Sequence, residues 1–204
     1  MGPMGAFEFA AKVDSDIEAL SASDHRLRVG RAKVLLEELL PISRLALSLK
    51  TPGLSVQVEG YEDDGPVDGH IQISGYKDAA FDVEVTCVHG YEEHLRAELL
   101  NQEGSCPGAG AIRRKNGKII AEMEAVDYDA YIHDTASKVI QAFSKKNEKT
   151  YPSGTVLIIA VAELKLSGWG NWKLFYESIQ DKGGFKDSQF SRVYVFNLET
   201  SEIV

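Results

Sequence analysis

The chain has 204 residues, of which 44% are hydrophobic and 26% are charged, a composition typical of a soluble globular protein with a full core. Its 31 acidic residues outnumber its 22 basic ones, and the formal net charge is −9. This balance argues against a broad basic surface for nucleic acid, but it leaves room for a local basic groove.

The amino-terminal residues and the cysteines bear on location. Residues 1–13 lack a basic region followed by an apolar run, so we expect no signal peptide. We expect these residues to form a flexible segment, followed by a single α/β domain over residues 14–204. The longest apolar run, residues 156–162, is too short to span a bilayer. Cys87 and Cys106 are too few for a disulfide framework, which favours a reducing, cytoplasmic setting, and the short apolar run predicts no membrane partner.

The first secondary structure that the sequence predicts is helical, over residues 14–50. Ser23 or Asp24 can cap a helix that presents a broad apolar side of leucines and valines. Pro41 should break or restart this helix, because proline lacks a backbone N–H and clashes with the preceding turn. The Thr-Pro-Gly sequence at residues 51–53 should end it.

Three short strands should follow, over residues 54–59, 70–74 and 79–89, because apolar and polar residues alternate in each. Their short connections predict an antiparallel meander. The third strand has two distinct faces. Its apolar face consists of Phe81, Val83, Val85 and Cys87, and its polar face consists of Asp82, Glu84 and Thr86. Two carboxylates on one strand face repel each other unless a cation compensates them.

The second half of the chain alternates helices and strands. Asn116-Gly117 is a strong hairpin signal, and with the helix before it predicts an excursion over about residues 91–125. The continuous apolar run at residues 155–162 is typical of a central strand that is covered on both faces. The remaining predicted elements are helices over residues 91–102, 128–149 and 171–181 and a strand over residues 192–198.

This order of elements, with Asp68 entering the second strand and Glu84-Val85-Thr86 on the third, resembles the restriction-endonuclease-like fold of the PD-(D/E)xK nuclease superfamily. The implied fold is α/β, a mixed central sheet of an antiparallel three-strand meander plus a buried strand, flanked by helices. The resemblance also implies that Asp68 and Glu84 hold Mg²⁺ or Mn²⁺ for hydrolysis of a nucleic-acid phosphodiester. Thr86 stands at the position of the motif lysine.

The chemistry of such a site is coherent. Adjacent strands lie about 5 Å apart, so carboxylates from two strands can share one ion, and Mg²⁺ needs few protein ligands. Asp82 lies two residues before Glu84, and His70 lies two residues after Asp68, so each is expected on the same strand face as that acid. Both are candidate additional ligands. The competing interpretation is a solvent-facing strand surface, on which acidic residues need no function.

Thr86 carries no positive charge, so a catalytic site needs a lysine from elsewhere. Lys77, in the preceding turn, and Lys138, on the helix after the excursion, are the candidates, although each also fits an ordinary solvated lysine. Without a replacement, the chain would be a catalytically inactive nuclease-like module that binds a protein or acts as an accessory component.

The densest local basic patch lies at the tip of the predicted hairpin. It consists of Arg113, Arg114, Lys115 and Lys118. Cations of this kind contact the phosphate backbone of DNA or RNA, which makes the patch a candidate nucleic-acid surface. A solvated turn would have the same composition. No phosphate-binding loop of the Gly-x-x-x-x-Gly-Lys-Ser/Thr type is present.

Overall fold

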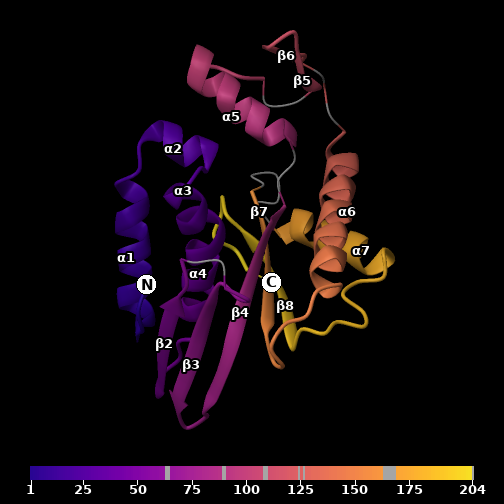
Figure 1. Cartoon of the computed structure of the whole chain (residues 1–204). Coiled ribbons are helices and arrows are strands. Elements are labelled where there is room, and N and C mark those ends of the chain that lie inside the picture. Colours follow the sequence, from indigo (N-terminus) through magenta and orange to yellow (C-terminus); the bar gives the residue numbers. More distant parts are fainter. Residues whose placement is uncertain are drawn as a thin grey trace.

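The computed structural model describes residues 1–62, 65–88, 91–107, 110–123, 125, 127–162 and 169–203. Within these residues the chain forms a six-stranded sheet that carries helices on both faces (Figure 1). In spatial order its strands are β1 (Met4–Gly5), β2 (Leu54–Gly60), β3 (Gly69–Gly75), β4 (Ala79–Val88), β7 (Val156–Val161) and β8 (Arg192–Asn197). The helices of the sheet layers are α1 (Ala6–Glu18), α2 (Ala22–Leu27), α3 (Arg31–Lys33), the π-helix η1 (Val34–Leu39), α4 (Leu40–Ser48), α6 (Tyr128–Asn147) and α7 (Trp169–Asp181).

Strand pairing divides the sheet into two halves. β2, β3 and β4 form an antiparallel meander, whereas β4, β7 and β8 are parallel. Every residue of β7 is buried, as its apolar sequence predicts for a central strand. The predicted α/β fold with a mixed sheet flanked by helices is therefore confirmed.

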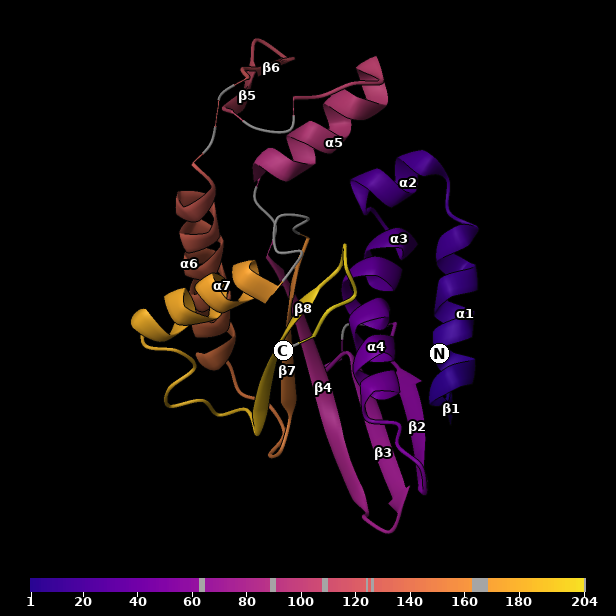
Figure 2. The same ribbon diagram turned by 180° about the vertical axis from the view of Figure 1, so that it is seen from behind.

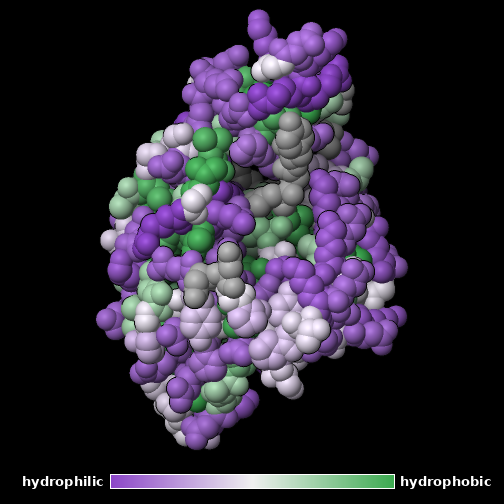
Figure 3. All heavy atoms as spheres, viewed as in Figure 1, coloured by the Kyte–Doolittle hydropathy of each residue, from purple (hydrophilic) through white to green (hydrophobic). Residues whose placement is uncertain are grey.

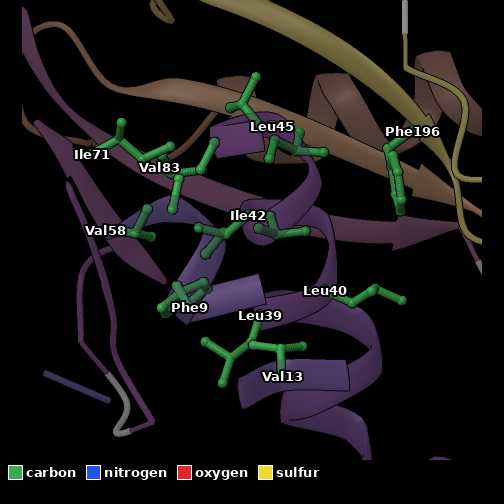
Figure 4. Close-up of a cluster of buried hydrophobic side chains, with 14 of the residues drawn as sticks. Phe9, Val13, Leu39, Leu40, Ile42, Leu45, Val58, Ile71, Val83 and Phe196 are labelled. Carbon is green, nitrogen blue, oxygen red and sulfur yellow. The ribbon is translucent and has the colours of Figure 1, made fainter. Parts of the chain in front are cut away.

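The first face of the sheet packs against α1, η1 and α4. Val83 and Val85 of β4 project into this core, which confirms the apolar face predicted for that strand. Figure 4 shows how the layers meet: side chains from α1, from η1 and α4, and from the sheet converge on one cluster, in which Phe9, Leu39 and Ile42 are fully buried. This cluster fixes η1 against the middle of the sheet.

The amino-terminal residues are ordered, contrary to the expectation of a flexible segment over residues 1–13. Met4 pairs with Val58 at the sheet edge, and α1 buries Phe9 and Val13 completely. The physical reason is that Ala6, Phe9, Ala10 and Val13 recur at helical spacing, so one side of α1 can cover the sheet.

Pro41 does not end the helix that contains it. The chain passes from α3 through η1 into α4, and Pro41 occupies the first turn of α4. Pro41 cannot donate a hydrogen bond to the carbonyl of Glu37 four residues earlier. The thiol of Cys87 on β4 donates to that carbonyl instead, at 3.5 Å. The helix therefore restarts at Pro41, which is one of the two outcomes that its chemistry predicted, and does not end there.

The second face is covered only in part. α6 and α7 pack over β7 and β8 and form a separate core around Leu157, Ile159 and Phe175. Figure 2 shows these two helices beside β7 and β8, away from α1 and α4. On the meander half this face carries polar side chains, among which Ser55, Gln57, Gln72 and Ser74 are exposed.

The predicted excursion is present at one end of the molecule (Figure 1). It contains α5 (Tyr91–Glu103) and a hairpin of β5 (Ile112–Lys115) and β6 (Lys118–Ala121). Asn116 and Gly117 both have positive φ, which confirms the turn that their sequence predicts. Leu95, Leu99 and Ile112 form a small core of their own.

Candidate active site at the fork of two strands

A fork opens where β3 begins and β4 continues. Gly69 of β3 lies opposite Val83, and beyond this pair β4 runs on to Val88 beside β7. Asp68 sits at the opening: its N–H donates to the Val83 carbonyl at 2.9 Å, and its Oδ2 accepts the Val85 N–H at 2.7 Å. The Asp68 carboxylate therefore replaces the hydrogen bond that a further residue of β3 would have made.

Glu84 lies on β4 between the two backbone groups that bind Asp68. Asp68 immediately precedes β3, and its carboxylate binds the backbone N–H of Val85, the residue after Glu84, so the two acids are neighbours at the fork. The Glu84 side chain is only 9% exposed. That these two acids share one face of adjacent strands stays a prediction.

A lysine that was not predicted contacts Glu84. Lys146, in the last turn of α6, donates its Nζ to Glu84 Oε1, and the Tyr151 hydroxyl donates to the same oxygen at 3.2 Å. The Lys146 side chain is 20% exposed. Glu84 is thus a buried carboxylate with a cation and a phenol on one oxygen.

The sequence contains a signal for Lys146. Val139 and Phe143 are buried residues of α6, and Lys146 follows Phe143 by three positions. It therefore continues the buried stripe of the helix, whereas the neighbouring Lys145 and Lys149 are exposed.

Burial and neighbouring negative charge act on the acids at the fork. Burial, and next the charge of Glu84, raise the pKa of Asp68 to about 7, although the Val85 N–H opposes the shift. Burial also raises the pKa of Glu38, on η1, and Glu84 contributes to that shift. Glu38 is therefore electrostatically coupled to the fork, in a helical turn of the π type that is frequent at functional sites.

The other predicted ligands lie one step farther along the same face. His70 and Asp82 are directly opposite each other, and His70 Nδ1 lies 2.8 Å from Asp82 Oδ1. They contact each other, and no contact of either with Asp68 or Glu84 is found within the described residues. Across the described chain, no group of three or more His, Cys, Asp or Glu side chains is arranged to hold a metal ion.

The two lysines that were expected to replace the motif lysine do not contact the fork. Lys77 lies in the turn after β3, at the opposite end of that strand from Asp68. Lys138 lies on α6, about two turns before Lys146, and pairs with Asp134 at 2.9 Å. Position on the helix, and not proximity in sequence, decides which lysine reaches Glu84.

The hairpin cations are partly neutralised. Arg113 pairs with Glu122 at 3.1 Å, and Arg114 pairs with Glu98 of α5 at 2.5 Å. Lys115 and Lys118 are exposed and face each other at the tip of the hairpin. This patch belongs to the excursion, whereas the fork lies in the body of the sheet (Figure 1).

A cavity of about 510 Å³ lies between the end of β4 and α6. We call it the lysine groove, because Lys138, Lys145, Lys146 and Lys149 line it together with Thr86. Lys146 thus faces both the groove and Glu84. Figure 3 shows that hydrophilic residues cover α6 on the face that contains this helix.

Among the described helices, none combines the length and the hydropathy that crossing a bilayer requires. Comparison of the chain with protein-family models, with curated proteins and with solved structures found no match. The assignment of a function therefore depends on the geometry of the fork alone.

Proposed function

We propose that the chain is a metal-dependent phosphodiesterase that acts on nucleic acid, with its active site at the fork of β3 and β4. The observation that carries this proposal is the juxtaposition of Asp68, Glu84 and Lys146. Asp68, just before β3, and Glu84, on β4, are neighbours, and a lysine from a distant helix contacts Glu84. The lysine supplies the positive charge that Thr86 lacks.

The donor set fits a small divalent cation. Asp68 and Glu84 would hold Mg²⁺ or Mn²⁺, because these ions keep several waters and need only one or two carboxylates from the protein. The bound ion would polarise the phosphate and lower the pKa of a coordinated water. Burial, and next the charge of Glu84, raise the pKa of Asp68, and a cation bound at the fork would oppose both effects.

The chain's own residues have distinct tasks in this proposal. The Val85 N–H holds the Asp68 carboxylate at the fork, and the Tyr151 hydroxyl holds that of Glu84. Lys146 places a positive charge beside both acids, where it can stabilise the charge that develops on the phosphate oxygens. Burial of Glu84 strengthens this electrostatic effect, because water screens it less.

A second candidate is a catalytically inactive module of the same design that binds a protein partner. Two observations favour it: Thr86 replaces the motif lysine, and Glu84 already has two partners, Lys146 and Tyr151. In that case the Lys146–Glu84 pair serves only to join α6 to the sheet.

Metal binding and cleavage distinguish the two candidates. We expect Mg²⁺ or Mn²⁺ to raise the melting temperature of the native chain, and Asp68→Asn and Glu84→Gln to abolish this shift. Glu59→Gln, on the same sheet face but on β2, is the matched control and should keep it. Plasmid, single-stranded DNA and RNA are then incubated with Mn²⁺. Cleavage that persists in Glu84→Gln would refute the site, and a native chain without metal response or cleavage would leave the inactive module.

A further inference from the structure

We propose that the lysine groove binds the phosphodiester backbone of a single nucleic-acid strand and leads it to the fork. This inference rests on the proposed function in taking a nucleic acid as the substrate, and it assigns the binding surface to α6 instead of the hairpin. The argument depends on the spacing of the lysines, on the absence of acids in the groove and on its junction with Glu84.

Two lysines of α6 form a row, and a third follows the end of the helix. Lys138 and Lys145 lie within about 20° of each other around a helix of 3.6 residues per turn, so they share one side of α6, and Lys149 lies two residues after the helix ends. Seven residues separate Lys138 from Lys145, which corresponds to about 10 Å along the helix. A single phosphate group is too short to contact both lysines.

A nucleic-acid strand has the matching dimension. Each strand of a B-form helix carries one negative charge per about 3.4 Å of axis, so a row of about 10 Å faces roughly three backbone charges. Lysine binds phosphate as a point charge, without selecting a base, and this chemistry suits a backbone whose sequence varies.

The charges in the groove are available to such a ligand. No carboxylate lines the groove within the described residues, and in that part of the chain Lys145 and Lys149 form no ion pair. Lys138 shares its charge with Asp134, and Lys146 shares its charge with Glu84. The hairpin patch is balanced in the same way, because its two arginines are paired with glutamates, so the position of the groove beside Glu84 is what distinguishes the two surfaces.

The groove ends at the candidate active site. Lys146 lines the groove and at the same time contacts Glu84, and Thr86 lines it from the strand that carries Glu84. A strand that follows these lysines therefore reaches Lys146, the residue that contacts Glu84. The hairpin tip, on the excursion, has no such connection.

The test measures binding without cleavage. A fluorescently labelled oligo(dT) strand is titrated in EDTA at several salt concentrations, and the slope of log K against log salt is compared between variants. For Lys145→Ala/Lys149→Ala we expect weaker binding and a slope that is smaller by about 0.7 for each lysine removed. Lys77→Ala/Lys182→Ala removes the same charge from exposed sites outside the groove and should leave the slope unchanged.

Three results would overturn the proposal. The first is an equal loss in the groove pair and the control pair, which would mean that only net charge matters. The second is a larger loss in Lys115→Ala/Lys118→Ala, which would assign binding to the hairpin. The third is equal competition by polyglutamate, which would mean that any polyanion binds. Binding is measured in EDTA, which prevents metal-dependent cleavage, so the two proposals can fail separately. A native chain that binds oligo(dT) through the groove but cleaves nothing with Mn²⁺ would refute the hydrolase and support the groove. A chain that cleaves, but whose binding is unchanged in the groove pair, would support the hydrolase and refute the groove.

Discussion

Lys146 and Glu84 are 62 residues apart in the chain, yet the Nζ of the lysine donates a hydrogen bond to Oε1 of the glutamate. Both side chains are largely shielded from water, so each is the main charge compensation of the other. The pair joins the last turn of α6 to the centre of the sheet. Its contribution to stability can be measured separately from any activity.

We expect Lys146→Met to lower the free energy of unfolding by about 2–4 kcal/mol, because it leaves the buried Glu84 carboxylate without a cation. Lys145→Met, at an exposed neighbouring position, should change it by less than about 0.5 kcal/mol. Urea denaturation at neutral pH measures both. The double variant Glu84→Gln/Lys146→Met should recover part of the loss, and strictly additive effects would show that the two residues are not coupled.

The pKa of Asp68 predicts a pH dependence of stability. Its folded value of about 7 lies above the ordinary value of 3.8, so the folded state binds a proton that the unfolded state releases. The stabilisation from that proton is complete below about pH 4 and is lost as the pH rises through 7. Asp68→Asn, which keeps an oxygen for the Val85 N–H, should therefore gain stability relative to the native chain as the pH rises, by about 1–3 kcal/mol.

Chemical denaturation of both proteins at several values across that window checks this prediction. The stability difference between Asp68→Asn and the native chain should be small at the acidic end and largest above pH 7. A difference that does not change with pH would mean that Asp68 is ionised throughout. Addition of Mg²⁺ at the basic end should reduce the difference, because a cation at the fork compensates the native carboxylate.

A lysine returned to the motif position should compensate for the loss of Lys146. Thr86 lies two residues after Glu84 on the same strand face, so the side chain of Thr86→Lys can approach the glutamate. We expect Thr86→Lys to restore about half of the stability lost in Lys146→Ala. Any nuclease activity should recover in parallel. Val88→Lys, two residues farther from Glu84 on that face, serves as the comparison and should restore neither.

The packing of α1 against the sheet can be tested at Phe9. Phe9→Ala should lower the free energy of unfolding by about 3–5 kcal/mol, because the ring is fully buried between α1 and the sheet. Phe7→Ala removes an equal side chain that is 67% exposed, and it should cost less than about 1 kcal/mol. Equal effects of the two substitutions would contradict the packing of α1.

The sequence predicted the sheet well where a local pattern determines the structure. Alternation in residues 79–88 placed Glu84 on the polar face of its strand, and the continuous apolar run predicted the buried β7. The Asn116-Gly117 turn likewise depends only on its own two residues. The restriction-endonuclease-like assignment itself stays a prediction.

Interactions between distant segments were harder to predict. Lys146 reaches Glu84 only because α6 crosses the second face at that level, and charged residues near a helix end usually face solvent. Pro41 restarts a helix, as local chemistry allows, but the π-helical turn before it was not predicted. Phe9 and Val13 carried a helical pattern that the glycine-containing terminus obscured.

The π-helical turn η1 has a consequence for the angular arrangement of its helix. A π turn contains one residue more than an α turn, and one residue corresponds to a rotation of about 100°. The side chains of α3 and α4 are therefore out of phase, and no single helical wheel describes residues 31–48. This rotation allows Leu45 to pack on the sheet while Glu38 is coupled to Glu84. Deletion of one residue from η1 would restore ordinary α-helical geometry but turn α3 by more than a quarter of a circle relative to α4.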